Sequence, residues 1–232
     1  IFETIADQTS NPSINLGEDA QVIDEVTQYF DLPSDGSAVT LKQADYNGSS
    51  FEAASNVPGT VQARIEGQKV IVTGFDFDKN FVTDTAKEDG TYGKKLIISF
   101  TITPDPEFWG GNQVPTNVLA NSGVKASSGL LAGNFPDPGT QDVPLKEIAL
   151  TDKDVNVYYG GATPDAAGLV NQITFPNDWC TDYVNPITYS VNNTVNNTED
   201  GTYTVTATLS PKYTGEYRAN TADATAKVYV YK

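Results

Sequence analysis

The sequence predicts an all-β protein made of two tandem immunoglobulin-like β-sandwich domains. Short runs of β-forming residues recur about every ten residues, and turn residues separate them. The clearest run, residues 202–209 (TYTVTATL), alternates between polar and apolar side chains, and residues 225–231 repeat the pattern. The 232 residues, 38% of them hydrophobic, are enough to form a core in each of two domains.

In the first domain, the pair Gly67-Gln68 predicts a tight hairpin between two expected strands. Residues 24–30 (DEVTQYF) fit either a helical turn or a continued strand, because their periodicity does not decide between the two. Residues 1–10 have helical spacing and predict a short helix end. The expected strands of this half are residues 20–23, 38–41, 61–65, 69–73 and 95–103.

A proline-rich patch, residues 135–145 (FPDPGTQDVPL), predicts a stiff junction between the domains. We therefore expect a first domain over residues 1–141 and a second over residues 142–232. The expected strands of the second half are residues 147–150, 155–159, 171–175, 186–192, 202–210 and 225–231.

Composition excludes several functions. The net charge of -16 repels nucleic acid and anionic membrane surfaces, and no apolar run is long enough for membrane insertion of this segment. The absence of histidine excludes Ser-His-Asp and Cys-His catalytic sets. Cys180 is the single cysteine, so an intrachain disulfide cannot form, and its apolar setting predicts a buried side chain. We expect that the chain is not an enzyme.

Four stretches of the sequence are distinctive together: GEDAQVIDEVTQYFDLP (17–33), VTGFDFDKNFV (72–82), GKKLIISFTITP (93–104) and FWGGNQVPTN (108–117). They resemble the stalk β domain that follows the von Willebrand A domain in Gram-positive cell-wall adhesins and pilus-tip proteins. The opening IFETIADQ looks like the last helix of such an A domain, and 142–161 and 178–191 resemble the next stalk domain. The resemblance implies an extracellular, cell-wall-anchored structural segment whose partners are neighbouring domains of the same surface protein.

The resemblance also implies a spontaneous isopeptide bond between a lysine amine and an asparagine carboxamide, promoted by a buried acid. That chemistry needs a neutral lysine and a protonated acid in one apolar pocket, and burial shifts both pKa values in the required direction. The candidates are Lys94 or Lys95 for the amine, Asn117 for the amide, and Asp24 or Glu25 for the acid. In the second domain, relatives often carry asparagine near the final strand, where this chain has Lys227. Lys146 or Lys153 with an internal asparagine is left open there.

Two further sites are weighed against structural roles. Asp76, Asp78 and Asn80 have the start of a calcium-loop spacing, but Phe81 and Lys87 stand where an EF-hand needs glycine and an acid. Two interpretations of these acids are open: an irregular calcium site, there or at Asp137 and Asp142, or a polar strand edge that binds no ion. We expect no other cofactor. The alternative function is binding of carbohydrate or host matrix protein, with the contact residues Trp109, Tyr158 and Tyr159.

Overall fold

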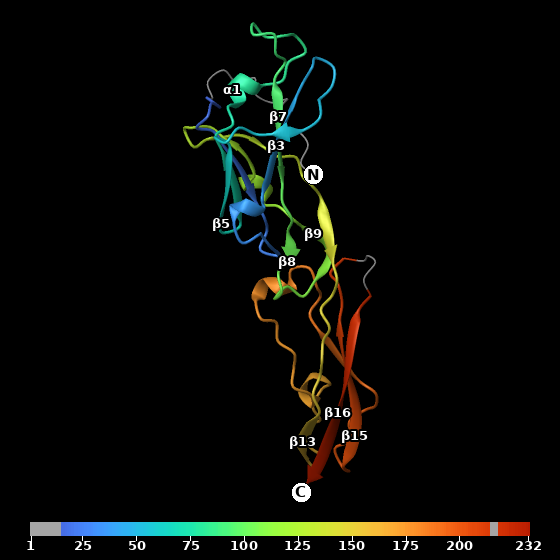
Figure 1. Ribbon diagram of the computed structural model, residues 1–232. Coiled ribbons are helices and arrows are strands. Elements are labelled where there is room, and N and C mark those ends of the chain that lie inside the picture. Colours follow the sequence, from blue (N-terminus) through green and yellow to red (C-terminus); the bar gives the residue numbers. More distant parts are fainter. Residues whose placement is uncertain (1–14, 214–217) are drawn as a thin grey trace. The chain divides into compact units, whose positions relative to one another are not determined.

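The computed structural model describes residues 15–213 and 218–232, so the helix end expected at residues 1–10 lies outside the described chain (Figure 1). The described chain is all-β, with many strands and only short helical turns. It divides into two compact units. Unit 1 holds the chain up to Asp105 together with Pro115–Thr140, and unit 2 holds Pro106–Val114 and Gln141–Lys232. The division after Thr140 falls beside the boundary expected at 142, but Pro106–Val114 groups with unit 2.

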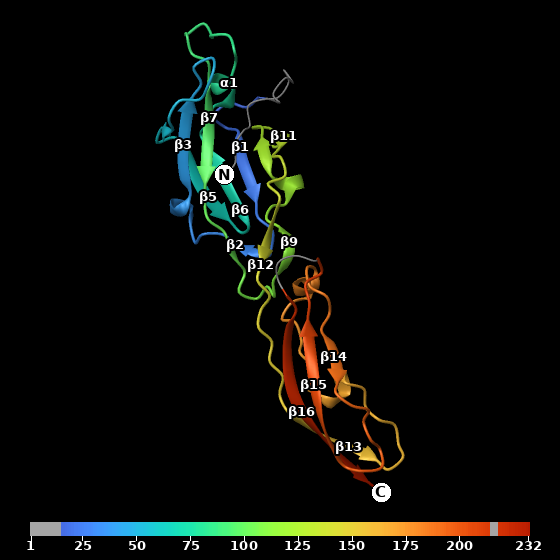
Figure 2. The ribbon, with the colours of Figure 1, turned by 90° about the vertical axis from the view of Figure 1, so that its right-hand side faces the viewer.

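Unit 1 contains two main sheets, and neighbouring strands in each are antiparallel (Figure 2). The five-stranded sheet has the order β11 (Leu131–Asn134), β10 (Gly123–Lys125), β1 (Gln21–Glu25), β6 (Lys69–Thr73) and β5 (Gln62–Glu66). The three-stranded sheet has the order β4 (Ser55–Asn56), β3 (Thr40–Asp45) and β7 (Lys94–Ser99). The other elements of this unit are the pair β2 (Phe30–Asp31) and β8 (Thr103–Pro104), the 3-10 turns Gly36–Ala38 and Leu119–Asn121, and the helical turn α1 (Phe77–Asn80).

The core of unit 1 combines side chains from both of these sheets. Val22 of β1 and Val70 of β6 are buried, and Leu41 of β3 and Leu96 of β7 pack against the same cluster. Each buried side chain of this size contributes about 1.5–3 kcal/mol to folding. The predicted hairpin at Gly67-Gln68 is confirmed, because Glu66 pairs with Lys69 across the turn and Gly67 has the positive φ of 57° that glycine tolerates.

In unit 2 the principal sheet has four strands, in the order β13-β16-β15-β14, and Figure 2 labels all of them. They are β13 (Lys153–Tyr158), β16 (Asn220–Tyr231), β15 (Gly201–Leu209) and β14 (Thr188–Val191). β13 runs parallel to β16, whereas the other neighbours are antiparallel. Buried side chains such as Val205, Ala226 and Val228 pack with Leu169 and Val170. Leu169 belongs to the 3-10 turn Ala167–Leu169, so in the described residues irregular segments help to cover this face.

The strands expected at residues 147–150 and 171–175 do not form. Ile148 lies in the first of these segments and Ile173 in the second, and both pack beside Trp109 in a second cluster of unit 2. The apolar side chains are therefore used for burial without a strand partner. Where the sequence suggested only loops, β9 (Gly111–Pro115) pairs with β12 (Thr140–Val143). The 3-10 turn Asp178–Thr181 places Cys180 in the same cluster as Trp109.

Candidate functional site

The inner face of β1 carries one acid, Asp24. Side chains alternate across a strand, so Asp24 lies on the same face as Val22 and Val26. All three residues are buried, and Asp24 is only 4% exposed. Asp24 stands opposite Val70 of β6, itself a core residue. A carboxyl group thus occupies a core-facing position that an aliphatic side chain would normally fill.

Asn117 lies directly beside this acid, although 93 residues separate the two in sequence. The segment that contains Asn117 forms an isolated antiparallel bridge with Val26, immediately after β1. The Asn117 Nδ2 group donates a hydrogen bond to Oδ1 of Asp24. Thr116 Oγ1 donates to Asn117 Oδ1 at 2.6 Å, so both ends of the amide are held. We call Asp24 and Asn117 the acid–amide pair.

Burial raises the pKa of Asp24 above its ordinary value, and the hydrogen bonds from Asn117 and Ser122 oppose that rise. The protonated form of Asp24 is therefore favoured more than that of an exposed aspartate. The implied chemistry requires a protonated acid that polarises the amide carbonyl, whereas here Asp24 contacts Nδ2 of Asn117 and the Thr116 hydroxyl contacts Oδ1.

Glu25, the other candidate acid, lies on the opposite face of β1 because it is the next residue along the strand. Its Oε2 is 3.2 Å from Nζ of Lys69, the residue paired with it on β6. Its backbone N–H donates to Ser122 Oγ at 3.0 Å. The geometry therefore favours Asp24 over Glu25 as the acid beside Asn117.

The two candidate lysines have partners elsewhere in unit 1. Lys94 Nζ is 3.1 Å from Oδ1 of Asp45, the residue opposite it on β3. Lys95 Nζ lies 4.3 Å from the centre of the Phe51 ring, a cation–π contact. Neither contact includes the acid–amide pair.

Lys94 also lines a cleft together with Gly74 and Phe75. These two residues follow Thr73, which is opposite Gln21 at one end of the β1–β6 ladder. Asp24 is near the other end of that ladder, where Glu25 faces Lys69. The structure therefore brings together the acid and the amide of the implied reaction and places Lys94 toward the opposite end of the sandwich.

In unit 2, the lysines and the cysteine named from the sequence have local partners. Lys153 Nζ donates to the carbonyl oxygens of Gly168 and Val170, which ties the start of β13 to a 3-10 turn. Lys146 Nζ donates to the carbonyl oxygen of Pro106. Cys180 is fully buried, as predicted, and its Sγ donates to the carbonyl oxygen of Glu107.

The residues of the candidate calcium loop cap and anchor the helical turn α1. Asp76 accepts a hydrogen bond from the backbone N–H of Lys79 as the N-cap, and its Oδ2 is 3.0 Å from Lys79 Nζ. Asp78 accepts from the backbone N–H of Leu16, and Asn80 Nδ2 donates to the carbonyl oxygen of Asp76.

The two junction acids each accept a backbone hydrogen bond: Asp137 from Gly139 and Asp142 from Gln113. Within residues 15–213 and 218–232, no cluster of three or more His, Cys, Asp or Glu residues is placed to hold a metal ion.

The candidate aromatic contact residues divide between core and surface. Trp109 is 8% exposed and packs against Phe175 at 4.4 Å between ring centres, so its ring is not presented to a ligand in solution. Tyr158 and Tyr159 are 66% and 54% exposed.

Sequence reasoning missed Thr116 and Ser122, which orient the pair, because isolated hydroxyl residues in turns have no distinguishing pattern. It also missed Tyr229 and Tyr231, although the alternation of KVYVYK could have indicated them.

No family model matches the chain, and no curated protein matches it significantly. None of the helices in the described part of the chain has the length and apolar character needed to cross a membrane.

Proposed function

We propose that this chain is a structural stalk segment of a cell-wall-anchored surface protein, which projects an adhesive domain away from a Gram-positive cell. The support is the resemblance of residues 17–33, 72–82, 93–104 and 108–117 to such stalk domains, together with an all-β fold and a strongly acidic composition. We assign the chain no enzymatic activity.

The observation that carries this proposal is the way the acid–amide pair ties β1 to a segment far along the chain. Backbone hydrogen bonds continue the connection on both sides of the pair: Thr27 N–H donates to the Thr116 carbonyl at 2.9 Å, and Val118 N–H donates to the Glu25 carbonyl at 2.7 Å. Thr27 Oγ1 also donates to the Pro115 carbonyl at 2.7 Å. A load-bearing stalk must resist forces that pull a strand away from its sheet. A buried connection between segments far apart in the sequence provides such resistance.

In the covalent version of this connection, a neutral lysine Nζ attacks Cγ of Asn117. The new C–N bond forms, the bond from Cγ to Nδ2 breaks, and the leaving nitrogen departs as ammonia after it gains one proton, which passes from the amine through Asp24. Lys94 and Lys95 have their contacts at Asp45 and Phe51 instead. We therefore expect the acid–amide pair of this chain to act as a hydrogen-bonded clamp, without a bond from Asn117 to either lysine.

Surface labelling tests the proposed role. Antibodies raised against this chain should label intact cells that produce the protein, and treatment of those cells with external protease should remove the signal. A cytoplasmic protein of the same cells is the control and should be labelled only after lysis. Labelling of the chain only in lysed cells would contradict the proposal.

A further inference from the structure

The outer face of the four-stranded sheet in unit 2 ends in a group of exposed tyrosines. Along β16 the buried residues Ala226 and Val228 alternate with exposed residues, so Lys227, Tyr229 and Tyr231 project from the opposite face. Tyr229 is 41% exposed and Tyr231 is 43% exposed. On the neighbouring strand, Tyr158 projects from the same face.

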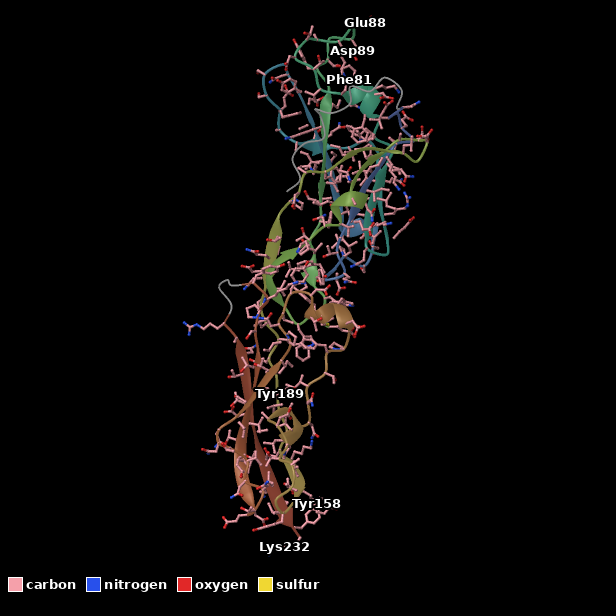
Figure 3. The ribbon with its side chains drawn as sticks, turned by 180° about the vertical axis from the view of Figure 1, so that it is seen from behind. Phe81, Glu88, Asp89, Tyr158, Tyr189 and Lys232 are labelled. Atoms are coloured by element: carbon pink, nitrogen blue, oxygen red, sulfur yellow. The ribbon has the colours of Figure 1, made fainter. Side chains whose placement is uncertain are left out.

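The parallel register of β13 and β16 brings these rings together. Tyr158 is paired with Tyr231, and their ring centres are 4.5 Å apart with an interplanar angle of 52°. Hydrogen bonding with the Tyr158 side chain raises the pKa of the Tyr231 hydroxyl. Figure 3 labels Tyr158 and Lys232 at the same end of unit 2. We call Tyr158, Tyr229 and Tyr231 the tyrosine platform.

Polar side chains border the platform in register. Asn156 is paired with Tyr229, and Asp154 is paired with Lys227 in the next row. Further along the face, Thr206 Oγ1 donates to Asp223 Oδ1 at 2.6 Å. By strand alternation, the outward rows of the whole sheet hold the platform, these polar residues and further hydroxyl residues such as Ser190, Thr204 and Thr225. These rows contain aromatic, hydroxyl, amide and charged side chains but no aliphatic one.

This combination suits one kind of partner. A pyranose ring presents C–H groups on a face, which pack on an aromatic ring, and hydroxyl groups at its rim, which bond to hydroxyl, amide and carboxylate side chains. The centre of a protein interface is depleted of charged residues, whereas Asp154 and Lys227 stand paired on this face close to the platform. The net charge of -16, with Asp154 and Asp223 on the face, disfavours a polyanion.

We propose that the tyrosine platform binds an uncharged oligosaccharide, with hexopyranose rings stacked on Tyr158 and Tyr231 and hydroxyl groups bonded to Asn156 and Asp154. Tyr159 lies beside this site, and Lys232 Nζ is 5.2 Å from the centre of its ring. The proposal does not depend on the stalk role, because it concerns only the surface of unit 2.

Titration calorimetry of the full chain tests the proposal with four probes: hexamers of β-linked glucose, of β-linked galactose and of N-acetylglucosamine, and a heparin hexasaccharide as the anionic comparison. We expect saturable binding of at least one uncharged hexamer and none of heparin. Tyr158→Ala and Tyr231→Ala should each weaken that binding about tenfold, whereas Tyr231→Phe should retain most of it because the ring remains.

Tyr213→Ala is the matched control, because Tyr213 is an exposed tyrosine of unit 2 outside the platform. It should bind as the unmodified chain does, and thermal unfolding of each variant shows whether its fold is retained. The proposal is overturned if no uncharged hexamer binds, if only heparin binds, or if Tyr231→Ala and Tyr158→Ala both bind with unchanged affinity. Equal weakening by the Tyr213→Ala control would also overturn it.

Discussion

Replacement of Asn117 by alanine tests the acid–amide pair most sharply among single substitutions. The change removes the Nδ2 donor to Asp24 and the acceptor of the Thr116 hydroxyl. Asp24 is 4% exposed, so water does not readily replace the lost donor. Loss of a hydrogen bond to a buried charged or partly charged group, with its partner left unsatisfied, costs about 3 kcal/mol. We therefore expect Asn117→Ala to lower the free energy of unfolding of unit 1 by that amount.

A double-mutant cycle isolates the interaction between the two side chains. Asp24→Ala removes the carboxyl that Asn117 satisfies, so the variant that carries both changes should lose less stability than the sum of the single losses. We expect a coupling energy of about 2 kcal/mol. Asn56→Ala is the matched control, because Asn56 is an exposed asparagine of unit 1 whose amide oxygen accepts from Lys42 Nζ at 2.5 Å. It should change the free energy of unfolding by less than about 0.5 kcal/mol.

The positions of the two tryptophans allow the unfolding of unit 2 to be followed separately. Both tryptophans, Trp109 and Trp179, belong to unit 2. Urea unfolding followed by circular dichroism reports both units, whereas tryptophan fluorescence reports unit 2 and serves as the internal reference. Asn117→Ala should move the circular dichroism transition more than the fluorescence transition. A loss of stability no larger than that of Asn56→Ala, or a coupling energy near zero, would show that the acid–amide pair does not stabilise unit 1.

Three further predictions follow from the same structure. Burial raises the folded-state pKa of Asp24, so the folded protein keeps a proton that the unfolded chain has lost. Its free energy of unfolding should fall as the pH rises from the ordinary aspartate pKa through the folded value, and Asp24→Asn should reduce that fall in a urea series at several pH values. Gly74→Ala should destabilise unit 1 by more than about 1 kcal/mol, since Gly74 has a φ of 86° and an added Cβ would lie 2.1 Å from the Thr60 carbonyl oxygen; unchanged calorimetric unfolding would contradict this. Leu169→Ala should cost unit 2 about 2–5 kcal/mol, because Leu169 is fully buried, and should shift the tryptophan fluorescence transition; an unshifted transition would show that the site repacks without loss.

Local sequence patterns correctly predicted the strands whose residues both alternate as in a strand and find a partner strand. Residues 69–73 form a strand with the expected bounds, and the hairpin before it follows from the freedom of Gly67 to take a positive φ. Residues 171–175 have a similar apolar spacing but no strand partner, and Ile173 and Phe175 instead pack, partly buried, against the cluster of Trp109 in an irregular segment. Periodicity reports which side chains are buried, and it does not report whether the backbone finds a partner.

The candidate site could be predicted only in part, because local sequence patterns do not show which distant segments meet. An acid in an apolar strand is visible in the sequence, and Asp24 could be named from it. Its contact with Asn117 depends on a bridge between segments far apart in the chain, and no local pattern contains that information. Lys94 was named because apolar residues follow it, but the β3–β7 register places it opposite Asp45 instead.

Single-molecule stretching of the chain tests the claim of a load-bearing role most directly. We expect unit 1 to unfold in one step, at a force that Asn117→Ala lowers and Asn56→Ala leaves unchanged. Intact mass measured on the same sample should equal that of the plain sequence, without the loss of ammonia that a bond from Asn117 to a lysine would cause. Equal unfolding forces for the unmodified chain and Asn117→Ala would show that the buried pair does not hold unit 1 together under load.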